Sequence, residues 1–207
     1  MLRSVAAVFA VLLLAGCQGG GDKQAATVSS TSNAFGLIPA VVKNVEPSVV
    51  TVITPAAQGS GVVYRSNGYV ITNNHVTGGF RQVVVVFADG KRVQAKVRAR
   101  TPLYDIAVLQ LDRQNLPAAG FAKRLPEVGA LAVAMGNPLG FENSVTAGII
   151  SGLHREIPGG GSTPALVDLI QTDAAISPGN SGGALLDAAG NVVGINVAYI
   201  PPGAGAV

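Results

Sequence analysis

The residues with the clearest chemical potential are a serine set among glycines and the two histidines of the chain. Ser181 lies in Gly179-Asn180-Ser181-Gly182-Gly183, directly before an apolar stretch. An exposed hydroxyl beside a sharply turning backbone suits attack on a carbonyl, because nearby N–H groups can hold the developing oxyanion. We expect the N–H groups of Gly179 and Ser181 to be these donors. An ordinary glycine-rich turn that contains a serine is the alternative.

The order of residues along the chain limits which partners this serine can have. The same segment fits Gly-x-Ser-x-Gly of the α/β-hydrolases, but that fold needs a histidine after the serine, and both His75 and His154 precede Ser181. The subtilisin order of Asp, His and Ser could use His154, but it belongs to a helix-rich α/β sheet that the pattern does not show. The trypsin-like order is available as His75, Asp105 and Ser181, and we predict these three as the catalytic triad.

The local contexts of His75 and Asp105 suit these roles. His75 follows the β-branched stretch Tyr69–Thr72 and two asparagines, so its imidazole is expected at the end of a strand. Asp105 directly precedes the apolar stretch Ile106–Leu111. A histidine or an aspartate in such a place is more often structural when it is taken alone. The combination of three suitable contexts in one order is what favours nucleophilic catalysis.

The elements that must position these residues are predicted to be strands. A short helix over Phe35–Val45, limited by Pro47, precedes two groups of short β-branched or apolar segments that are separated by turn signals such as Asn67-Gly68 and Asp89-Gly90. The first group is Ser48–Thr54, Gly61–Arg65, Tyr69–Thr72, Gln82–Phe87, an alternating basic strand from Lys91 to Arg100, and Ile106–Leu111. The second group is Leu131–Met135, Val145–Gly152, Leu166–Thr172, Gly183–Leu186 and Val192–Ala198. No amphipathic helix of twelve residues separates these strands, so an all-β fold of two barrels, split near residues 118–126, is expected.

The N-terminus indicates export. Arg3 precedes an apolar stretch from Val5 to Leu14, which is too short to cross a bilayer of about 30 Å as a helix but is typical of a signal peptide. Leu14-Ala15-Gly16-Cys17 resembles a bacterial lipobox, in which the cysteine is acylated and becomes the mature N-terminus. We predict a signal peptide over residues 1–16, a lipidated Cys17 and a flexible tether up to residue 35. A plain secretory signal with an incidental cysteine is the alternative.

This reading places the protein in the bacterial cell envelope. Gln18 follows the cysteine, which in a Gram-negative host favours an outer-membrane anchor facing the periplasm. Cys17 is the only cysteine, so no internal disulfide can form.

The composition excludes some other functions. The chain has 207 residues, of which 12% are charged, and its formal net charge is only +3. Aromatic residues make up 5% and tryptophan is absent, so base-stacking platforms are scarce and nucleic acid is not an expected partner. The basic segment from Lys91 to Arg100 alternates with apolar residues and is expected to be the solvated face of a strand, with a phosphate or anionic-lipid patch as the alternative.

From residue 36 to about residue 200 the chain resembles the HtrA/Deg branch of the trypsin-like serine proteases. The matching segments are Gly59-Ser60-Gly61-Val62, Thr72-Asn73-Asn74-His75-Val76, Asp105-Ile106-Ala107-Val108-Leu109, Met135-Gly136-Asn137-Pro138, Val145–Ser151, Gln171-Thr172-Asp173-Ala174, Gly179–Gly183 and Gly194-Ile195-Asn196.

The resemblance implies a chymotrypsin-like double β-barrel over residues 36–207, with barrels at about 36–118 and 125–207. It also implies an endopeptidase for unfolded or damaged envelope proteins that needs no metal or other cofactor. Ile176 and Tyr199 fall at the positions that line the S1 pocket, and Asn196–Ala198 at the edge that pairs with substrate. Since neither pocket position is acidic, a small or medium apolar P1 side chain is expected.

The C-terminus departs from the family pattern. Members of the family usually continue with a further strand, a helix and PDZ domains, whereas Pro201 and Pro202 here cannot prolong a central strand. The second barrel is therefore expected to lack its last strand, either because the sequence is a fragment or because a compact variant closes differently. The oligomeric state is open, with a trimer implied only by resemblance. A non-catalytic peptide-binding module or holdase, or an inactive fragment, is the alternative to an active enzyme.

Overall fold

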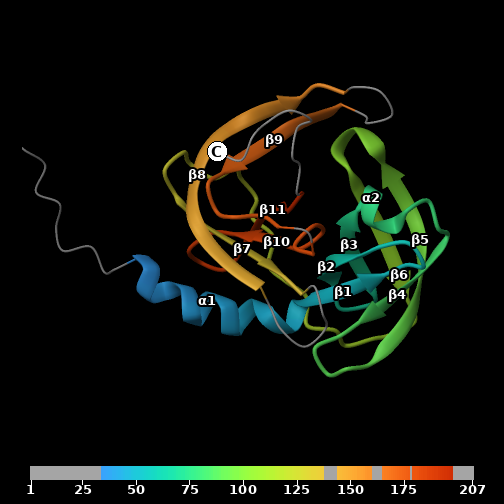
Figure 1. The fold of residues 1–207 in the computed structure, drawn as a ribbon. Coiled ribbons are helices and arrows are strands. Elements are labelled where there is room, and N and C mark those ends of the chain that lie inside the picture. Colours follow the sequence, from blue (N-terminus) through green and yellow to red (C-terminus); the bar gives the residue numbers. More distant parts are fainter. Residues whose placement is uncertain (1–33, 138–143, 160–164, 178, 198–207) are drawn as a thin grey trace, which may run out of the picture. The chain divides into compact units, whose positions relative to one another are not determined.

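The computed structural model describes residues 34–137, 144–159, 165–177 and 179–197. The signal peptide, Cys17, most of the tether and Tyr199 lie outside the described residues. The elements in chain order are η1 (Ala34–Leu37), α1 (Ile38–Val45), η2 (Glu46–Ser48), β1 (Val49–Ile53), β2 (Gln58–Arg65), β3 (Tyr69–Asn73), α2 (Asn74–Thr77), β4 (Gln82–Val86), β5 (Arg92–Thr101), η3 (Pro102–Tyr104), β6 (Ile106–Leu111), β7 (Leu131–Gly136), β8 (Ser144–Ile157), β9 (Leu166–Thr172), β10 (Ala184–Leu186) and β11 (Val192–Ile195). Strands dominate, so the predicted all-β class is confirmed (Figure 1).

The first six strands form a closed antiparallel barrel in the order β1-β2-β3-β6-β5-β4. Its strands are rich in valine because β-branched side chains pack well on a pleated surface. The interior is apolar, with Val52, Val63, Val70, Val85 and Leu109 among its fully or almost fully buried side chains. The predicted strand Ile106–Leu111 is confirmed residue for residue as β6.

The turn between β4 and β5 and the basic strand that follows it both match expectation. Gly90 donates its N–H to the Phe87 carbonyl, which closes the predicted turn. Along β5 the charged residues are mostly exposed and Ala95 is buried, so this strand does present a solvated face. A hydrogen bond from the Arg113 guanidinium, 2.6 Å from the Asp89 carboxylate, holds the pKa of Asp89 below its usual value of 3.8.

The remaining strands form an open sheet in the order β11-β10-β7-β8-β9, which curls around its own apolar face (Figure 1). Val41 and Val45 of α1 pack against buried residues of β7, β10 and β11. Within the described residues, β9 and β11 are the two edges of this sheet. The expected second barrel is thus a five-stranded half-barrel over these residues. The part of the chain that could extend it, from residue 198 onward, is not described.

Several element boundaries differ from the sequence prediction, and for two of them strand pairing gives the reason. β2 begins at Gln58, three residues earlier than predicted, because its glycine-rich start pairs with β1, with Gly59 opposite Val52. β8 continues to Ile157, although its last residues are polar, because they pair with β9 through several register shifts. No helix in the described part of the chain has the length and apolar character needed to span a membrane.

Candidate active site

His75 and Asp105 meet at one end of the first barrel. β3 and β6 are antiparallel neighbours with Asn73 opposite Ile106, so the residue after β3 and the residue before β6 lie side by side. The Asn74 N–H and the Asn73 Nδ2 both donate to the Asp105 carbonyl oxygen, at 2.9 and 3.0 Å. His75 then sits in the single helical turn α2. The predicted position of the imidazole at a strand end is confirmed.

The carboxylate of Asp105 binds His75 at two points. Oδ2 lies 2.5 Å from the imidazole Nδ1, and Oδ1 accepts the His75 backbone N–H at 2.9 Å. The Asp105 side chain is 8% exposed, whereas that of His75 is 49% exposed. Because a carboxylate accepts hydrogen bonds, this contact favours the tautomer protonated on Nδ1 and leaves the Nε2 lone pair free to act as a base.

The backbone of Asp105 has the left-handed conformation, with φ 50° and ψ 39°. This conformation is uncommon outside glycine but is several-fold enriched in aspartate. It follows the tight turn η3, in which the Asp105 N–H donates to the Pro102 carbonyl. The turn directs the carboxylate back toward α2 rather than along β6.

Ser181 lies in a loop that leads into β10 and is held by its neighbours' backbone. The Asn180 N–H donates to Ser177, and the Gly183 N–H donates to Asn180. Gly182 has φ 86°, and a Cβ there would collide with the Ser60 carbonyl oxygen, so only glycine fits this position. Ser181 itself is only 6% exposed.

Strand β2 brings the histidine and the serine to one place. The Ser60 N–H donates to the Ser181 carbonyl at 2.7 Å. A Cβ added to Gly59 would lie 2.8 Å from the nearest Val76 methyl and 3.0 Å from the Ser181 carbonyl oxygen. The turn that carries His75 and the loop that carries Ser181 therefore pack against the same glycine. The predicted triad residues come from two sheets, and the segments that carry His75 and Ser181 meet at β2.

The expected oxyanion donors belong to the same loop. Gly179 has φ 101°, and its carbonyl oxygen accepts a hydrogen bond from the Ser60 hydroxyl at 2.6 Å. The donor role of the Gly179 and Ser181 N–H groups stays a prediction.

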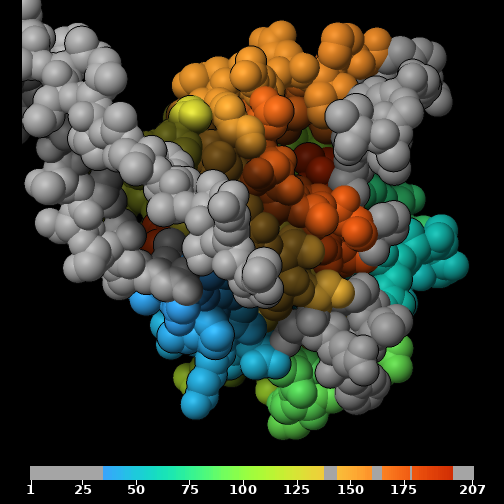
Figure 2. Space-filling view, turned by 60° about the vertical axis from the view of Figure 1, so that its left-hand side comes forward, coloured from blue at the N-terminus to red at the C-terminus, as the bar shows by residue number. Residues whose placement is uncertain are grey.

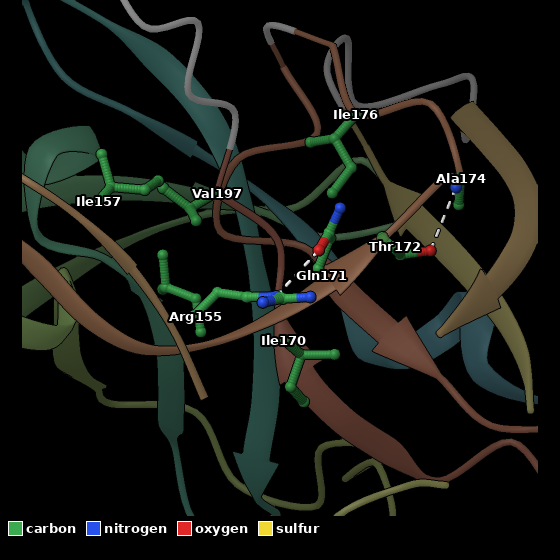
Figure 3. A pocket seen from close by; sticks show the side chains of 9 residues that line it. Arg155, Ile157, Ile170, Gln171, Thr172, Ala174, Ile176 and Val197 are labelled. Carbon is green, nitrogen blue, oxygen red and sulfur yellow. Dashed lines mark hydrogen bonds between the residues drawn. The ribbon is translucent and has the colours of Figure 1, made fainter. Parts of the chain in front are cut away.

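Ile176, one of the two residues expected to line the S1 pocket, lines a cavity of about 420 Å³ (Figure 3). Apolar side chains from β8, β9 and the segment after β11 form much of its wall, and Arg155 donates from Nε to Gln171 within it. None of its described lining residues is acidic. A second cavity of about 250 Å³ adjoins it, since Ile176 and Val197 line both. In the space-filling view, the orange surface of β8 and β9 borders a recess in which deeper red residues are visible (Figure 2).

Asn196 differs from expectation. Its N–H donates to Gly183, and its carbonyl accepts from Gly182, so both backbone groups are bonded to the serine loop. Its Nδ2 also donates to the carbonyl oxygens of Met135 and Ala184. The backbone of Asn196 therefore supports the loop and is not free to pair with substrate, although Asn196 does line the second cavity together with Ile176. The rest of the predicted edge, up to Ala198, stays a prediction. Tyr199 lies outside the described residues.

The second histidine has a different partner. His154 Nδ1 lies 2.7 Å from Asp168 Oδ1, between β8 and β9, and both side chains are more than half exposed. Both residues have positive φ, at 53° and 56°. Nothing in the sequence pattern indicated this pair. Nor did the sequence pattern indicate a role for Ser60, although Ser60 lies in one of the segments that carry the family resemblance.

Comparisons with known proteins point to one family. The model of the family described as "Trypsin-like peptidase domain" matches residues 59–195. The chain is 43% identical to "Protease Do-like 1, chloroplastic" of Arabidopsis thaliana, covering 72% of this chain and 35% of that protein. It is 44% identical to a "Probable periplasmic serine endoprotease DegP-like" of Pseudomonas putida, covering 67% of this chain and 28% of that protein.

Solved structures give the same result for the fold. "HtrA-type protease AlgW with tripeptide" matches with a TM-score of 0.66 at 42% identity, covering 75% of this chain and 52% of that one. "Crystal structure of Deg5" matches with a TM-score of 0.68 at 33% identity, covering 82% and 88%. The fold is therefore the chymotrypsin-like double barrel of these structures. The chain spans only about a third of the length of the curated relatives that it matches.

Proposed function

This chain belongs to the family of trypsin-like peptidase domains, and from that premise we propose that it is a serine endopeptidase. Ser181 is the nucleophile, His75 the general base and acid, and Asp105 the residue that orients the imidazole. The observation that carries the proposal is the double contact of the Asp105 carboxylate with the Nδ1 and backbone N–H of His75. This contact prepares the Nε2 of a partly exposed imidazole to accept a proton.

The reaction is acyl transfer in two halves. Nε2 of His75 takes the hydroxyl proton of Ser181 while Oγ bonds to the scissile carbonyl carbon, and the N–H groups of Gly179 and Ser181 stabilise the oxyanion. Collapse of this tetrahedral species breaks the C–N bond, and the imidazolium protonates the departing amine. A water molecule then attacks the acyl-enzyme, gives its proton to His75, and releases the carboxylic acid as Ser181 regains its proton.

The substrates in this proposal are unfolded polypeptides of the cell envelope. The larger of the two cavities lined by Ile176 is mostly apolar and has no acidic residue among its described lining, which supports a small or medium apolar P1 side chain rather than a basic one, while Asp168 lines the adjoining smaller cavity. Related HtrA-type structures were solved with a tripeptide and with a decapeptide, as their names state. In the same proposal, the protein is exported and held at the envelope membrane through lipidated Cys17.

The central test compares the wild-type protein with Ser181→Ala on unfolded casein, together with labelling by a fluorophosphonate probe. We expect cleavage and labelling by the wild type and neither by the variant. Equal cleavage by both proteins would refute the proposal. A wild-type protein that is folded by circular dichroism but binds casein without cleaving it would instead support the non-catalytic binding module.

The location is tested separately. We expect the Cys17→Ser variant to leave the membrane fraction and appear in the soluble fraction. If the variant still sediments with membranes as the parent does, lipid anchoring at this residue is wrong.

A further inference from the structure

Ser60 of β2 is fully buried and makes four hydrogen bonds. Its hydroxyl donates to the Gly179 carbonyl at 2.6 Å and accepts the Asn137 N–H at 2.8 Å. Its backbone N–H donates to the Ser181 carbonyl at 2.7 Å, and its carbonyl accepts from the Thr72 hydroxyl at 2.6 Å. A residue of the first barrel thus binds two carbonyl groups of the serine loop, which is more than a hundred residues away along the chain.

These two contacts hold both ends of one tripeptide. Gly179 and Ser181 are the first and last residues of that tripeptide, and the carbonyl of each points at Ser60. Fixing a carbonyl fixes the plane of the peptide unit to which it belongs, here Gly179–Asn180 and Ser181–Gly182. The N–H groups of Gly179 and Ser181 belong to the peptide units just before these, so they are positioned through the Cα atoms that they share with the held planes. Gly179 has φ 101°, a region in which glycine has several accessible conformations, so its own backbone preference does not hold the loop in this state.

We propose that Ser60 is a positioning residue that aligns the oxyanion-binding N–H groups by holding the Gly179 carbonyl. This inference rests on the proposed peptidase function. Ser60 is 0% exposed and cannot touch substrate, so it acts only through the loop. Since the oxyanion forms in the transition state, loss of alignment lowers kcat and leaves substrate binding nearly unchanged.

The chain contains a closely matched control. Thr51 of β1 is 1% exposed, and its hydroxyl donates at 2.6 Å to the Asn137 carbonyl. Thr51 therefore binds the carbonyl of Asn137 and Ser60 binds its N–H, each through a buried hydroxyl. Only Ser60 also reaches Gly179. Comparing Ser60→Ala with Thr51→Val separates alignment of the loop from the general loss of a buried hydrogen bond.

The experiment measures kcat and KM on a fluorogenic apolar peptide, and inhibition by a peptidyl boronate whose bound oxygen occupies the oxyanion position. All assays run at a temperature where circular dichroism shows each variant folded. For Ser60→Ala we expect kcat to fall by about 10- to 100-fold, somewhat less than for outright loss of a donor. KM should stay within twofold of the wild type, and boronate inhibition should weaken about as much as kcat. For Thr51→Val we expect a similar drop in melting temperature, with kcat within twofold of the wild type.

A second variant covers the case in which Ser60→Ala does not fold. Ser60→Cys keeps a weak donor of similar shape that cannot make so short a contact, so an intermediate loss of kcat is expected. Equal kcat for the Ser60 and Thr51 variants, or a loss confined to KM, would overturn the positioning role. A wild-type protein that neither cleaves peptide nor labels with fluorophosphonate would instead defeat the proposed function, so the two failures are distinguishable.

Discussion

Gly59→Ala is expected to separate the histidine from the serine. The added methyl would lie 2.8 Å from one Val76 methyl and 3.0 Å from the Ser181 carbonyl oxygen, whereas ordinary contacts begin at about 3.4 Å. Neither neighbour gives way easily. Val76 is 2% exposed with a stiff β-branched side chain, and the Ser181 oxygen is backbone held by Ser60. The turn bearing His75 and the loop bearing Ser181 must therefore move apart by about half an ångström.

Misplacement of catalytic groups by about 1 Å can cost about 100-fold in rate, so we expect kcat/KM to fall by about 10- to 100-fold. Overpacking should also lower the free energy of unfolding by about 1–3 kcal/mol. The assay is peptide hydrolysis well below the melting temperature, with the folded fraction measured by circular dichroism. Gly120→Ala is the control, because that residue is exposed and a Cβ there meets only the Asn191 amide oxygen, at 3.1 Å. Hydrolysis by Gly59→Ala within twofold of the wild type would refute this reasoning.

Three further substitutions test the electrostatics of the site and of the first barrel. Asp105→Asn should lower kcat by about 10³- to 10⁴-fold with little loss of folding, because an amide does not select the Nδ1-protonated tautomer of His75; steady-state kinetics beside a thermal melt would show this. His154→Ala should hydrolyse peptide within twofold of the wild type, and a loss comparable with that of His75→Ala would contradict the assignment. Asp89→Asn should melt below the wild type at pH 7, because Arg113 lowers the folded-state pKa of Asp89. That stabilisation is present above the unfolded value of 3.8 and is lost as the pH falls through the lowered pKa, so melting curves of the two proteins should converge in acid.

Much of the fold was predictable because its signals are local. Short apolar segments located β6 and β9 to the residue, and paired turn residues located the hairpins of the first barrel. The end of β8 was not predictable from its own residues, because His154, Arg155 and Glu156 are polar. Pairing with β9 decides that boundary, and a strand partner is a non-local property.

The candidate site also contains residues that the sequence could predict and residues whose role depends on non-local contacts. The types and order of His75, Asp105 and Ser181 were enough to predict a triad. Asn196 was predicted as a substrate edge, but its backbone groups are used by the serine loop. Asn196 bonds to Gly182 and Gly183 because β11 runs antiparallel to β10 and brings it back beside the serine loop. No local sequence pattern indicates this pairing.

By itself, the sequence determined the all-β class and predicted His75, Asp105 and Ser181 as the residues of a catalytic triad. The tertiary structure adds a reason to prefer His75, since His154, Asp168 and Ser181 also follow the order His, Asp, Ser, and that His–Asp pair is also hydrogen-bonded. The turn that carries His75, and not the segment that carries His154, packs with the serine loop against Gly59 of β2. The sequence determines which side chains can act as nucleophile, base and acid. The proximity of the His75 turn to the Ser181 loop depends instead on the packing of the first barrel against the second sheet.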